Sequence, residues 1–203
     1  LGFRNEIKFF INLGEYELLK SKISKIMNLD PNSNKDGYYT VTSHYFDNIN
    51  RDSIFEKQSG VIDRKKYRVR TYNKSKKLKI EKKVKRNNYI QKKSSYLKIE
   101  NYYDLLNKDF NFLDLNNNNE KLFFSELKSE LYNPDIVTEY HREAFVSNIN
   151  NIRITFDSNL RTYMNHKNDI FSKNYLTLDV IEQPLIIYEI KFDNYLPDFI
   201  RSI

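Results

Sequence analysis

Cysteine is absent from this 203-residue sequence, and glycine and proline occur only four times each. Without cysteine the chain has neither a disulfide framework nor thiolate chemistry. The four glycines are scattered, so neither a Gly-rich phosphate loop nor a dinucleotide fingerprint is present. The three histidines are far apart and lack the spacing of zinc ligands. No apolar run reaches the length of a membrane span, and no signal-peptide pattern opens the chain.

Hydrophobic residues make up 39% of the chain and aromatic residues 15%. This composition is typical of a globular protein, and the length allows one large domain or two small ones with a substantial core. The net charge of +7 favours anionic partners. Lysine is abundant together with Asn, Ile and Tyr, as expected from an AT-rich coding sequence. The placement of the charges is therefore more informative than their sum.

Hydrophobic periodicity predicts an α+β protein that is mostly β. Three segments have the spacing of amphipathic helices: Glu15–Met27, Tyr102–Leu106 and Glu120–Leu131. In the last of these, Phe123, Leu127 and Leu131 share one face. Eight segments read as strands, with Leu176–Ile181 as a weaker ninth: Phe3–Asn12, Tyr38–Asp47, Arg64–Tyr72, Lys77–Arg86, Tyr89–Tyr96, Ile136–Val146, Ile152–Leu160 and Leu185–Asp193. Because most connections are short, we expect an antiparallel sheet, and eight strands of this length can close into a barrel.

Charged residues occupy alternate positions in six of these strands, so they share one face of each strand. In the segment KLKIEKKVKR, Lys79 and Glu81 face one side while Leu78 and Ile80 face the other. For any single strand, an ordinary sheet with a wetted outer face is the better explanation. Six such strands, together with amphipathic helices that need an apolar surface, favour a curved or closed sheet with the charges inside.

The interior of such a sheet would hold twice as many cations as carboxylates. The cations are Lys8, Arg68, Arg70, Lys79, Lys83, Arg142, Arg153 and Lys191, and the carboxylates are Glu6, Glu81, Asp157 and Glu189. Uncompensated charges in a confined site are costly, so the cavity should be wet and should bind a polyanion. A nucleoside triphosphate, with about four negative charges, matches the surplus. Arginine and lysine suit phosphate oxygens, and the carboxylates suit Mg²⁺ or Mn²⁺ bridging the phosphates.

Seven motifs, in the family's order, resemble those of the VTC domain, the polyphosphate polymerase module of the triphosphate tunnel metalloenzyme (CYTH-like) superfamily. They are RNEIKF (Arg4–Phe9), SHYFD (Ser43–Asp47), RKKYRVRTY (Arg64–Tyr72), IEKKVKR (Ile80–Arg86), YHREAF (Tyr140–Phe145), IRITFD (Ile152–Asp157) and YEIKF (Tyr188–Phe192). The resemblance implies a single domain over residues 1–203, built as an eight-stranded antiparallel β-barrel, the triphosphate tunnel, with helices packed outside. It also implies transfer of the terminal phosphate of ATP to a growing polyphosphate chain, with Mn²⁺ or Mg²⁺ as cofactor.

Carried over position by position, the resemblance implies that six catalytic cations hold phosphates: Lys8, Arg68, Arg70, Lys83, Arg142 and Arg153. Further phosphate-binding candidates, from the resemblance or from the charged faces, are Lys79, Lys92, Tyr140 and Lys191. Glu189 would ligate the metal. Glu6 and Glu81 are inward carboxylates that either bind metal or hold the basic residues in place.

Two departures from the family's pattern bear on activity. The first motif has one Glu before its Lys, whereas related triphosphatases and class IV adenylate cyclases typically carry Glu-x-Glu-x-Lys, and this favours the polymerase branch. Similar domains continue past the segment PDFIRSI (residues 197–203) into a final helix and a Ser-Lys-Tyr motif, which this sequence does not contain. We therefore expect either a shortened polymerase domain or a protein that is not a full polymerase.

Other functions stay open. In a triphosphatase, water replaces the acceptor phosphate in the same tunnel, and a non-catalytic module that binds polyphosphate or another polyanion needs no metal carboxylate. Nucleic acid is disfavoured as a partner because most aromatic residues are at apolar-face positions. The expected partners are ATP and polyphosphate or triphosphate. The resemblance implies a cytoplasmic location and allows a membrane-protein partner at the inner face of a membrane, and the oligomeric state stays undefined.

Overall fold

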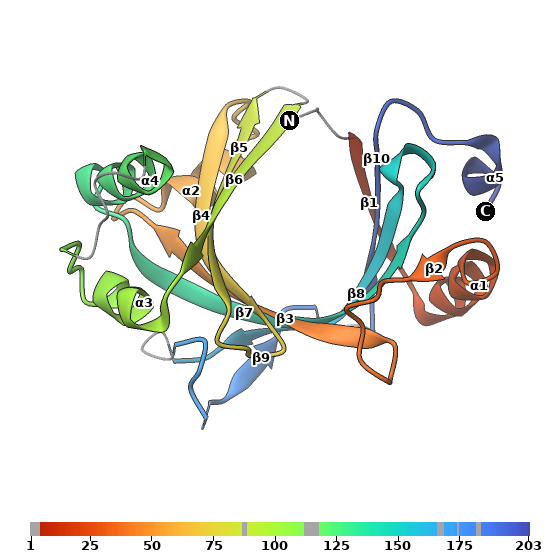
Figure 1. Cartoon of the computed structure of the whole chain (residues 1–203), viewed down its shortest axis with the longest axis horizontal. Helices are drawn as coiled ribbons and strands as arrows, with labels where there is room; N and C mark the ends of the chain where they lie inside the picture. Colours follow the sequence, from red (N-terminus) through yellow and green to blue (C-terminus); the bar gives the residue numbers. More distant parts are fainter. Residues whose placement is uncertain (1–4, 87–88, 112–117, 166–168, 174, 182–183) are drawn as a thin grey trace. The chain divides into compact units, whose positions relative to one another are not determined.

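The computed structural model of the chain describes residues 5–86, 89–111, 118–165, 169–173, 175–181 and 184–203 (Figure 1). The strands are β1 (Asn5–Ile11), β2 (Asn28–Leu29), β3 (Tyr38–Asp47), β4 (Arg64–Tyr72), β5 (Leu78–Arg86), β6 (Tyr89–Leu97), β7 (Asn133–Val146), β8 (Arg153–Tyr163), β9 (Thr177–Asp179) and β10 (Ile186–Phe192). The helices are α1 (Leu13–Ile23), α2 (Asp52–Gln58), α3 (Ile99–Leu106), α4 (Asn118–Ser129) and α5 (Asp198–Arg201), with a 3₁₀ turn, η1, at Ile149–Asn151.

Eight of the strands form one hydrogen-bonded path in the order β1-β10-β8-β7-β3-β4-β5-β6, while β2 pairs with β7 and β9 with β8. The pairs β1–β10, β10–β8, β4–β5 and β5–β6 are antiparallel. These eight strands are the eight that the sequence predicts, and β9 is the weaker ninth. The predicted fold class, an α+β protein with an eight-stranded antiparallel sheet and helices, is confirmed.

The strand bounds follow the prediction closely because period-two alternation is a local signal. β3 and β4 have the predicted bounds, and the other strands of the path differ by three residues or fewer. Phe3 and Arg4, which the prediction includes in the first strand, lie outside the described residues.

Helix α1 begins two residues before its predicted start because a capping box sets its N-terminus. The Asn12 side chain accepts a hydrogen bond from the Glu15 amide at 2.9 Å, and the Glu15 carboxylate accepts one from the Asn12 amide at 2.8 Å. The helix ends at Ile23, where the Ile26 amide donates to the Ile23 carbonyl in a tighter turn. Met27, predicted as the last helical residue, follows this turn and is still buried.

Helices α2 and α5 are absent from the prediction. The N-terminus of α2 is capped from several residues away, because Asp47 at the end of β3 accepts a hydrogen bond from the Ser53 amide at 3.1 Å. The Asn48 side chain accepts one from the Asp52 amide at 3.1 Å. The residue directly before the helix, Arg51, has a positive φ of 56° and makes no side-chain cap. A search for an adjacent capping residue therefore misses this helix.

The buried face of α4 differs from the predicted one. Phe124 and Leu127 are buried, whereas Leu131 lies beyond the end of the helix with a φ of 55° and is 67% exposed. The expectation that Leu131 belongs to the buried face is wrong. The side chain of Phe123 lies outside what the structure describes.

The chain divides into two compact units, each made of segments that are distant in sequence. Unit 1 comprises Leu1–Val41, Glu139–Thr162 and Thr177–Ile203, and unit 2 comprises Thr42–Thr138 and Tyr163–Leu176. Each unit has its own hydrophobic core. The expectation of a single domain over residues 1–203 stays a prediction.

The core of unit 1 lies on the apolar face of β1, β10 and β8. The antiparallel register aligns Ile7 with Ile190 and Ile190 with Ile154, and this face packs against Tyr16 and Ile23 of α1. In unit 2, the apolar face of β4 and β5 packs with α3 and α4 (Figure 1). Its buried residues include Val69, Ile80, Tyr102, Leu105, Phe124 and Leu127. The predicted packing of Ile80, Ile154 and Ile190 on the side opposite the charges is confirmed.

A buried histidine links β3 to α3 in the core of unit 2. His44 is 2% exposed, and its Nδ1 lies 2.8 Å from the Tyr102 hydroxyl, which accepts a hydrogen bond from the Ile170 amide at 3.2 Å. The Tyr102 hydroxyl thus links His44 to the backbone of Ile170, and it can donate its proton to Nδ1 when that nitrogen is unprotonated. Burial lowers the pKa of His44 to about 4.

This histidine should make the fold sensitive to acid. Because the folded pKa lies below the unfolded value of about 6.5, the unfolded state takes up the proton first as the pH falls. We expect His44 to remove about 2 kcal/mol from the free energy of unfolding between pH 7 and pH 5. Urea denaturation at both pH values should show that His44→Leu lacks this loss while the control His141→Gln keeps it. An equal loss in His44→Leu and the unsubstituted protein would contradict the assignment.

Candidate functional site: two charged faces

The charged face of unit 1 is formed by β1, β10 and β8, opposite the apolar face. The register aligns Glu6 with Lys191 and Lys191 with Arg153, and in the next row it aligns Lys8 with Glu189 and Glu189 with Thr155. Side chains two residues apart on a strand share a face, so these rows are neighbours. Arg142 of β7 joins them through Asp157 of β8, with which it forms an ion pair.

Glu189 is the most buried carboxylate of this face, with 2% of its surface exposed. Its Oε2 lies 3.5 Å from Lys8 Nζ and 4.0 Å from Arg142 Nη2, and its Oε1 is in ion-pair contact with Lys191. Burial alone raises the pKa of Glu189, but the charges of Lys191 and Lys8 outweigh it and hold the pKa below its ordinary value. Glu189 is therefore an ionised carboxylate shared by three cations.

Glu6 is the second carboxylate beside the same lysines. Its Oε1 lies 3.1 Å from Lys8 Nζ, and its Oε2 lies 3.9 Å from Lys191 Nζ. Lys8 thus bridges the carboxylates of Glu6 and Glu189, while half of its own side chain stays exposed. Two carboxylates with partly exposed cations between them are open to exchange with a ligand that brings its own charges.

The two arginines of this face are each held by a carboxylate. Arg142 donates from Nε and Nη2 to the two oxygens of Asp157, both at 2.6 Å, and its guanidinium lies 5.2 Å from the ring centre of Tyr140. Arg153 donates from Nη2 to Asp30 Oδ2 at 2.5 Å and to the Tyr39 hydroxyl at 2.7 Å. Tyr140 is thus beside Arg142, which lies in the same YHREAF motif.

Asp30 is a residue that the sequence analysis missed. It is 3% exposed, and its Oδ1 accepts hydrogen bonds from the backbone and the side chain of Asn32 at 2.9 and 2.8 Å. Burial raises the pKa of Asp30, but the Asn32 hydrogen bonds and the Arg153 charge hold it below its ordinary value. The turn sequence Asp-Pro-Asn-Ser at residues 30–33 signals an Asx turn, but nothing local identifies Arg153 as its partner.

The charged face of unit 2 is formed by β4, β5 and β6. Three rows cross it in register: Arg70–Lys79–Tyr96, Arg68–Glu81–Ser94 and Lys66–Lys83–Lys92. Glu81 is at the centre of these rows and is 1% exposed. Its Oε2 accepts from Arg68 Nε at 2.7 Å, and its Oε1 accepts from Lys92 Nζ at 2.8 Å. Both carboxylate oxygens are therefore engaged by cations.

The surrounding charges keep Glu81 ionised. Burial alone raises its pKa, but the charges of Arg68 and Arg70 and the hydrogen bond from Lys92 lower the pKa to about 2. Two arginines of this face also contact β3. Arg70 donates from Nε to Ser43 Oγ at 2.9 Å, and Arg68 donates from Nη1 to the Tyr45 hydroxyl at 3.1 Å.

The two faces differ in their balance of charge. On the charged face of unit 1, the described residues include four cations (Lys8, Arg142, Arg153, Lys191) and four carboxylates (Glu6, Asp30, Asp157, Glu189). On the three rows of the face of unit 2 that contain or flank Glu81, six cations (Lys66, Arg68, Arg70, Lys79, Lys83, Lys92) stand with that one carboxylate, and the next row, Arg64–Lys85, adds two more cations. The predicted surplus of positive charge is thus a property of unit 2. Strand parity finds most of these residues, but Asp30, Tyr39, Ser43, Tyr45 and Lys66 have no assigned role in the sequence analysis.

A single family model, described as the VTC domain, matches residues 3–203. The chain belongs to the VTC domain family. No curated protein sequence is significantly similar to it.

Solved structures show that this VTC domain has the fold of the triphosphate tunnel proteins. A proposed adenylate cyclase from Bacillus halodurans superposes with a TM-score of 0.56 at 12% identity, covering 99% of this chain and 85% of that one. A proposed adenylyl cyclase from Hippeastrum, described as having a dominant triphosphatase activity, superposes with a TM-score of 0.51 at 8% identity, covering 100% of this chain and 83% of that one. At these identities the likeness concerns the fold alone.

The carboxylates of the two charged faces can be compared with the ligands that the expected Mn²⁺ or Mg²⁺ prefers. In the part of the chain that the structure describes, no cluster of three His, Cys, Asp or Glu side chains forms a metal site by itself. Mg²⁺ is commonly held by one or two carboxylates while substrate phosphates and water complete its coordination. Glu6 and Glu189, which share Lys8, fit that mode. Glu81, with both oxygens engaged by cations, fits the role of holding basic residues in place.

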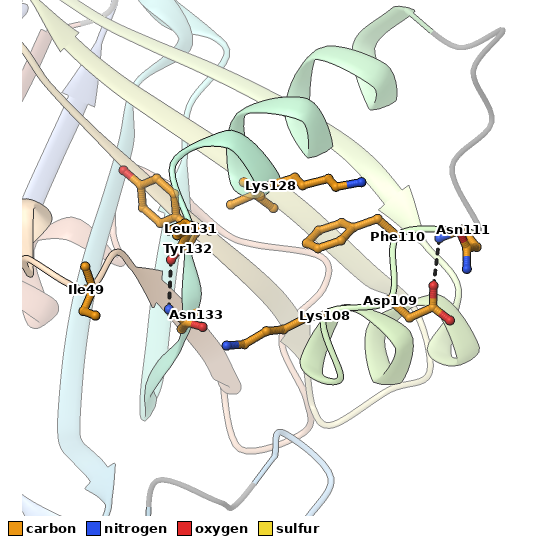
Figure 2. A pocket seen from close by; sticks show the side chains of 10 residues that line it. Ile49, Lys108, Asp109, Phe110, Asn111, Lys128, Leu131, Tyr132 and Asn133 are labelled. Carbon is orange, nitrogen blue, oxygen red and sulfur yellow. Dashed lines mark hydrogen bonds between the residues drawn. The ribbon is translucent and has the colours of Figure 1, made fainter.

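One groove of unit 2 is lined by none of the residues of its charged face. It has a volume of about 750 Å³ within unit 2, between the end of α3 and the end of α4 (Figure 2). Phe110, Leu127 and Leu131 line it together with Lys108 and Lys128. None of the predicted site residues lines this groove.

None of the helices in the described ranges combines the length and hydropathy needed to cross a membrane.

Glu81 should stabilise unit 2 through its charge. Because its folded pKa of about 2 lies below the unfolded value, this stability is present above pH 4.5 and is lost as the pH falls to 2. We expect Glu81→Gln to lower the free energy of unfolding at pH 7 by about 2–3 kcal/mol. The matched control is Glu100→Gln, an exposed carboxylate of α3. Denaturation curves that show the same loss at pH 3 and pH 7 would argue against an electrostatic cause.

Proposed function

We propose that this VTC domain is a metal-dependent polyphosphate polymerase that moves the terminal phosphate of ATP onto a polyphosphate chain. The observation that carries the proposal is the face of unit 2, where six cations stand with one carboxylate on three adjacent rows. Membership of the VTC domain family supports the same substrate class. A surface with this surplus of charge favours a ligand with several phosphates over one with a single phosphate.

Phosphoryl transfer needs positioning and neutralisation of charge more than covalent chemistry from the protein. In the proposal, Arg68, Arg70 and Lys83 bind phosphate oxygens on the face of unit 2, and Lys79 and Lys92 add charge at its sides. On the face of unit 1, Lys8, Arg142, Arg153 and Lys191 are the cations available to phosphate, and Tyr140 supports Arg142.

Glu189 and Glu6 would hold Mn²⁺ or Mg²⁺, which would neutralise phosphate charge. Their carboxylates contact Lys8 and Lys191, and a metal held there would take the place of lysine charge. Glu81, in contrast, keeps Arg68 and Lys92 in place on its own charged face.

The second candidate is a triphosphatase, in which water attacks instead of an acceptor phosphate. The fold shared with the Hippeastrum protein, described as having a dominant triphosphatase activity, favours it.

Incubation of the protein with ATP and Mn²⁺, followed by a gel stained for long polyphosphate, separates these functions. Long polyphosphate supports the polymerase, and release of inorganic phosphate without polymer supports the triphosphatase. Binding of polyphosphate with neither product identifies a binding module.

The affinity of the protein for a phosphate ligand should depend on how many negative charges the ligand carries. We expect tripolyphosphate to raise the melting temperature strongly by preferential binding to the folded state, and inorganic phosphate to raise it little. The difference should shrink at high ionic strength, because salt screens exposed charges. Differential scanning fluorimetry at matched ionic strength measures both shifts. Equal shifts from the two ligands would contradict the proposed polyanion site.

Glu189 and Arg70 should have opposite effects on binding. Glu189→Gln should abolish turnover yet leave metal-free tripolyphosphate binding unchanged or stronger, because a negative charge has left the site. Arg70→Ala should weaken binding by about 1.5–3 kcal/mol, the usual scale for a hydrogen bond to a charged group. Calorimetric titration measures both, with Arg201→Ala, an exposed arginine of α5, as the control for loss of charge. Full metal-dependent activity in Glu189→Gln would exclude Glu189 as the metal ligand.

A further inference from the structure

Strand β3 carries a row of hydroxyl groups that the proposed function does not use. Its odd-numbered residues Tyr39, Ser43 and Tyr45 share one face of the strand, opposite Phe46 and His44, which belong to the core side. Tyr39 and Ser43 are buried, at 4% and 0% exposure. We call these three residues the hydroxyl face of β3.

Each hydroxyl of this face accepts a hydrogen bond from a different arginine. Within unit 1, Arg153 Nη2 donates to the Tyr39 hydroxyl at 2.7 Å. Within unit 2, Arg70 Nε donates to Ser43 Oγ at 2.9 Å, and Arg68 Nη1 donates to the Tyr45 hydroxyl at 3.1 Å. These three arginines, Arg153 of β8 and Arg68 and Arg70 of β4, are all among the cations proposed above to bind phosphate.

A hydroxyl can orient an arginine without neutralising its charge, which a carboxylate cannot do. It accepts a hydrogen bond and so fixes the plane of the guanidinium, but it carries no charge and does not neutralise the cation. A guanidinium paired with a carboxylate is oriented at the expense of its net charge, as Arg142 is by Asp157. Bidentate phosphate binding depends on the plane of the fork and on its charge, so a hydroxyl is a suitable partner for a phosphate-binding arginine. Arg68 and Arg153 are also paired with Glu81 and Asp30, and for these two the hydroxyl adds a second fixed contact without adding negative charge.

We propose that the hydroxyl face of β3 positions arginines for phosphate within each unit: Tyr39 positions Arg153 in unit 1, and Ser43 and Tyr45 position Arg70 and Arg68 in unit 2. This inference rests on the proposed function for the identity of the ligand, while the orientation of the arginines stands on the hydrogen bonds alone. Tyr39, Ser43 and Tyr45 are positioning residues, since they act through the arginines.

The surroundings of Tyr45 supply a second, independent readout. The charges nearest to its hydroxyl are those of Arg68, Arg70 and Lys66 of β4. Glu81 of β5 accepts a hydrogen bond from Arg68, and Asp47 is two residues along β3. Burial alone raises the pKa of Tyr45, but the charges of Arg68 and Arg70 outweigh it and lower the pKa to about 8. Above that pH the residue becomes a phenolate, which neutralises part of the arginine charge.

The binding test compares variants that remove one oxygen each. We expect Ser43→Ala to weaken tripolyphosphate binding about 3- to 10-fold, and Tyr39→Phe and Tyr45→Phe to weaken it less, because Asp30 also holds Arg153 and Glu81 also holds Arg68. Ser43→Thr, which keeps a hydroxyl, should restore affinity. The matched control is Tyr67→Phe, which removes a hydroxyl one residue away from Arg68 on the opposite face, where it contacts Glu126. Unchanged affinity in both Ser43→Ala and Tyr45→Phe would overturn the proposal.

The pH dependence separates positioning from general destabilisation. Between pH 7 and pH 9 the affinity of the unsubstituted protein for tripolyphosphate should fall more than that of Tyr45→Phe. The reason is that Tyr45 becomes a phenolate only in the unsubstituted protein. Absorbance titration of the two proteins should show one tyrosine with a midpoint near pH 8 that is missing from Tyr45→Phe. Parallel pH profiles would count against Tyr45 as a positioning residue.

A measurement without ligand keeps the inference apart from the proposed function. The Arg70 Nε–H proton should exchange slowly with water in NMR spectra and at least about 10-fold faster in Ser43→Ala. The Arg68 Nε–H proton, which is hydrogen-bonded to Glu81, is the internal reference, and its exchange rate should not change. If tripolyphosphate fails to bind but Arg70 exchange responds, the proposed function fails and the positioning stands. If Arg70 exchange does not respond, the positioning fails whatever the ligand.

Discussion

The opposite orientation of successive side chains along a β-strand is the constraint on which the rest of this structure depends. Ile80 and Glu81 are neighbours in sequence and each is 1% exposed, yet one lies in the core under α3 and α4 and the other lies among Arg68 and Lys92. A register shift of one residue would place the carboxylate in the core and the isoleucine among the cations. Packing of the helices on the apolar face therefore holds the charged face in register.

The same alternation produces two faces with different electrostatics. In unit 1 the arginines are paired with carboxylates, as Arg142 is with Asp157 and Arg153 with Asp30, so the face is close to neutral. On the three rows around Glu81 in unit 2, this single carboxylate stands with six cations. Burying a carboxylate is costly unless cations compensate it, and here the cations exceed it. The surplus of positive charge is thus on the face of unit 2, and Glu6 and Glu189, which we propose as metal ligands, are on the face of unit 1.

The sequence predicted the strands and the members of the charged faces well, because both follow from local period-two patterning. It predicted the helices less well. The N-terminus of α2 depends on Asp47, which caps Ser53 from the end of the preceding strand, and the end of α4 leaves Leu131 exposed. These details depend on where a neighbouring element ends in space, and hydrophobic periodicity does not contain that information.

The sequence by itself determined which side chains share a face of each strand, and with it the cationic character of the site, because alternation needs no knowledge of the partner strand. Only the tertiary structure decided which groups those side chains contact. Asp30 lies 123 residues from Arg153, and Ser43 lies 27 residues from Arg70. Such pairs are set by strand order and register, which arise from long-range packing of the two cores. Which arginines contact a carboxylate, a hydroxyl or both therefore appears only once the strands are paired.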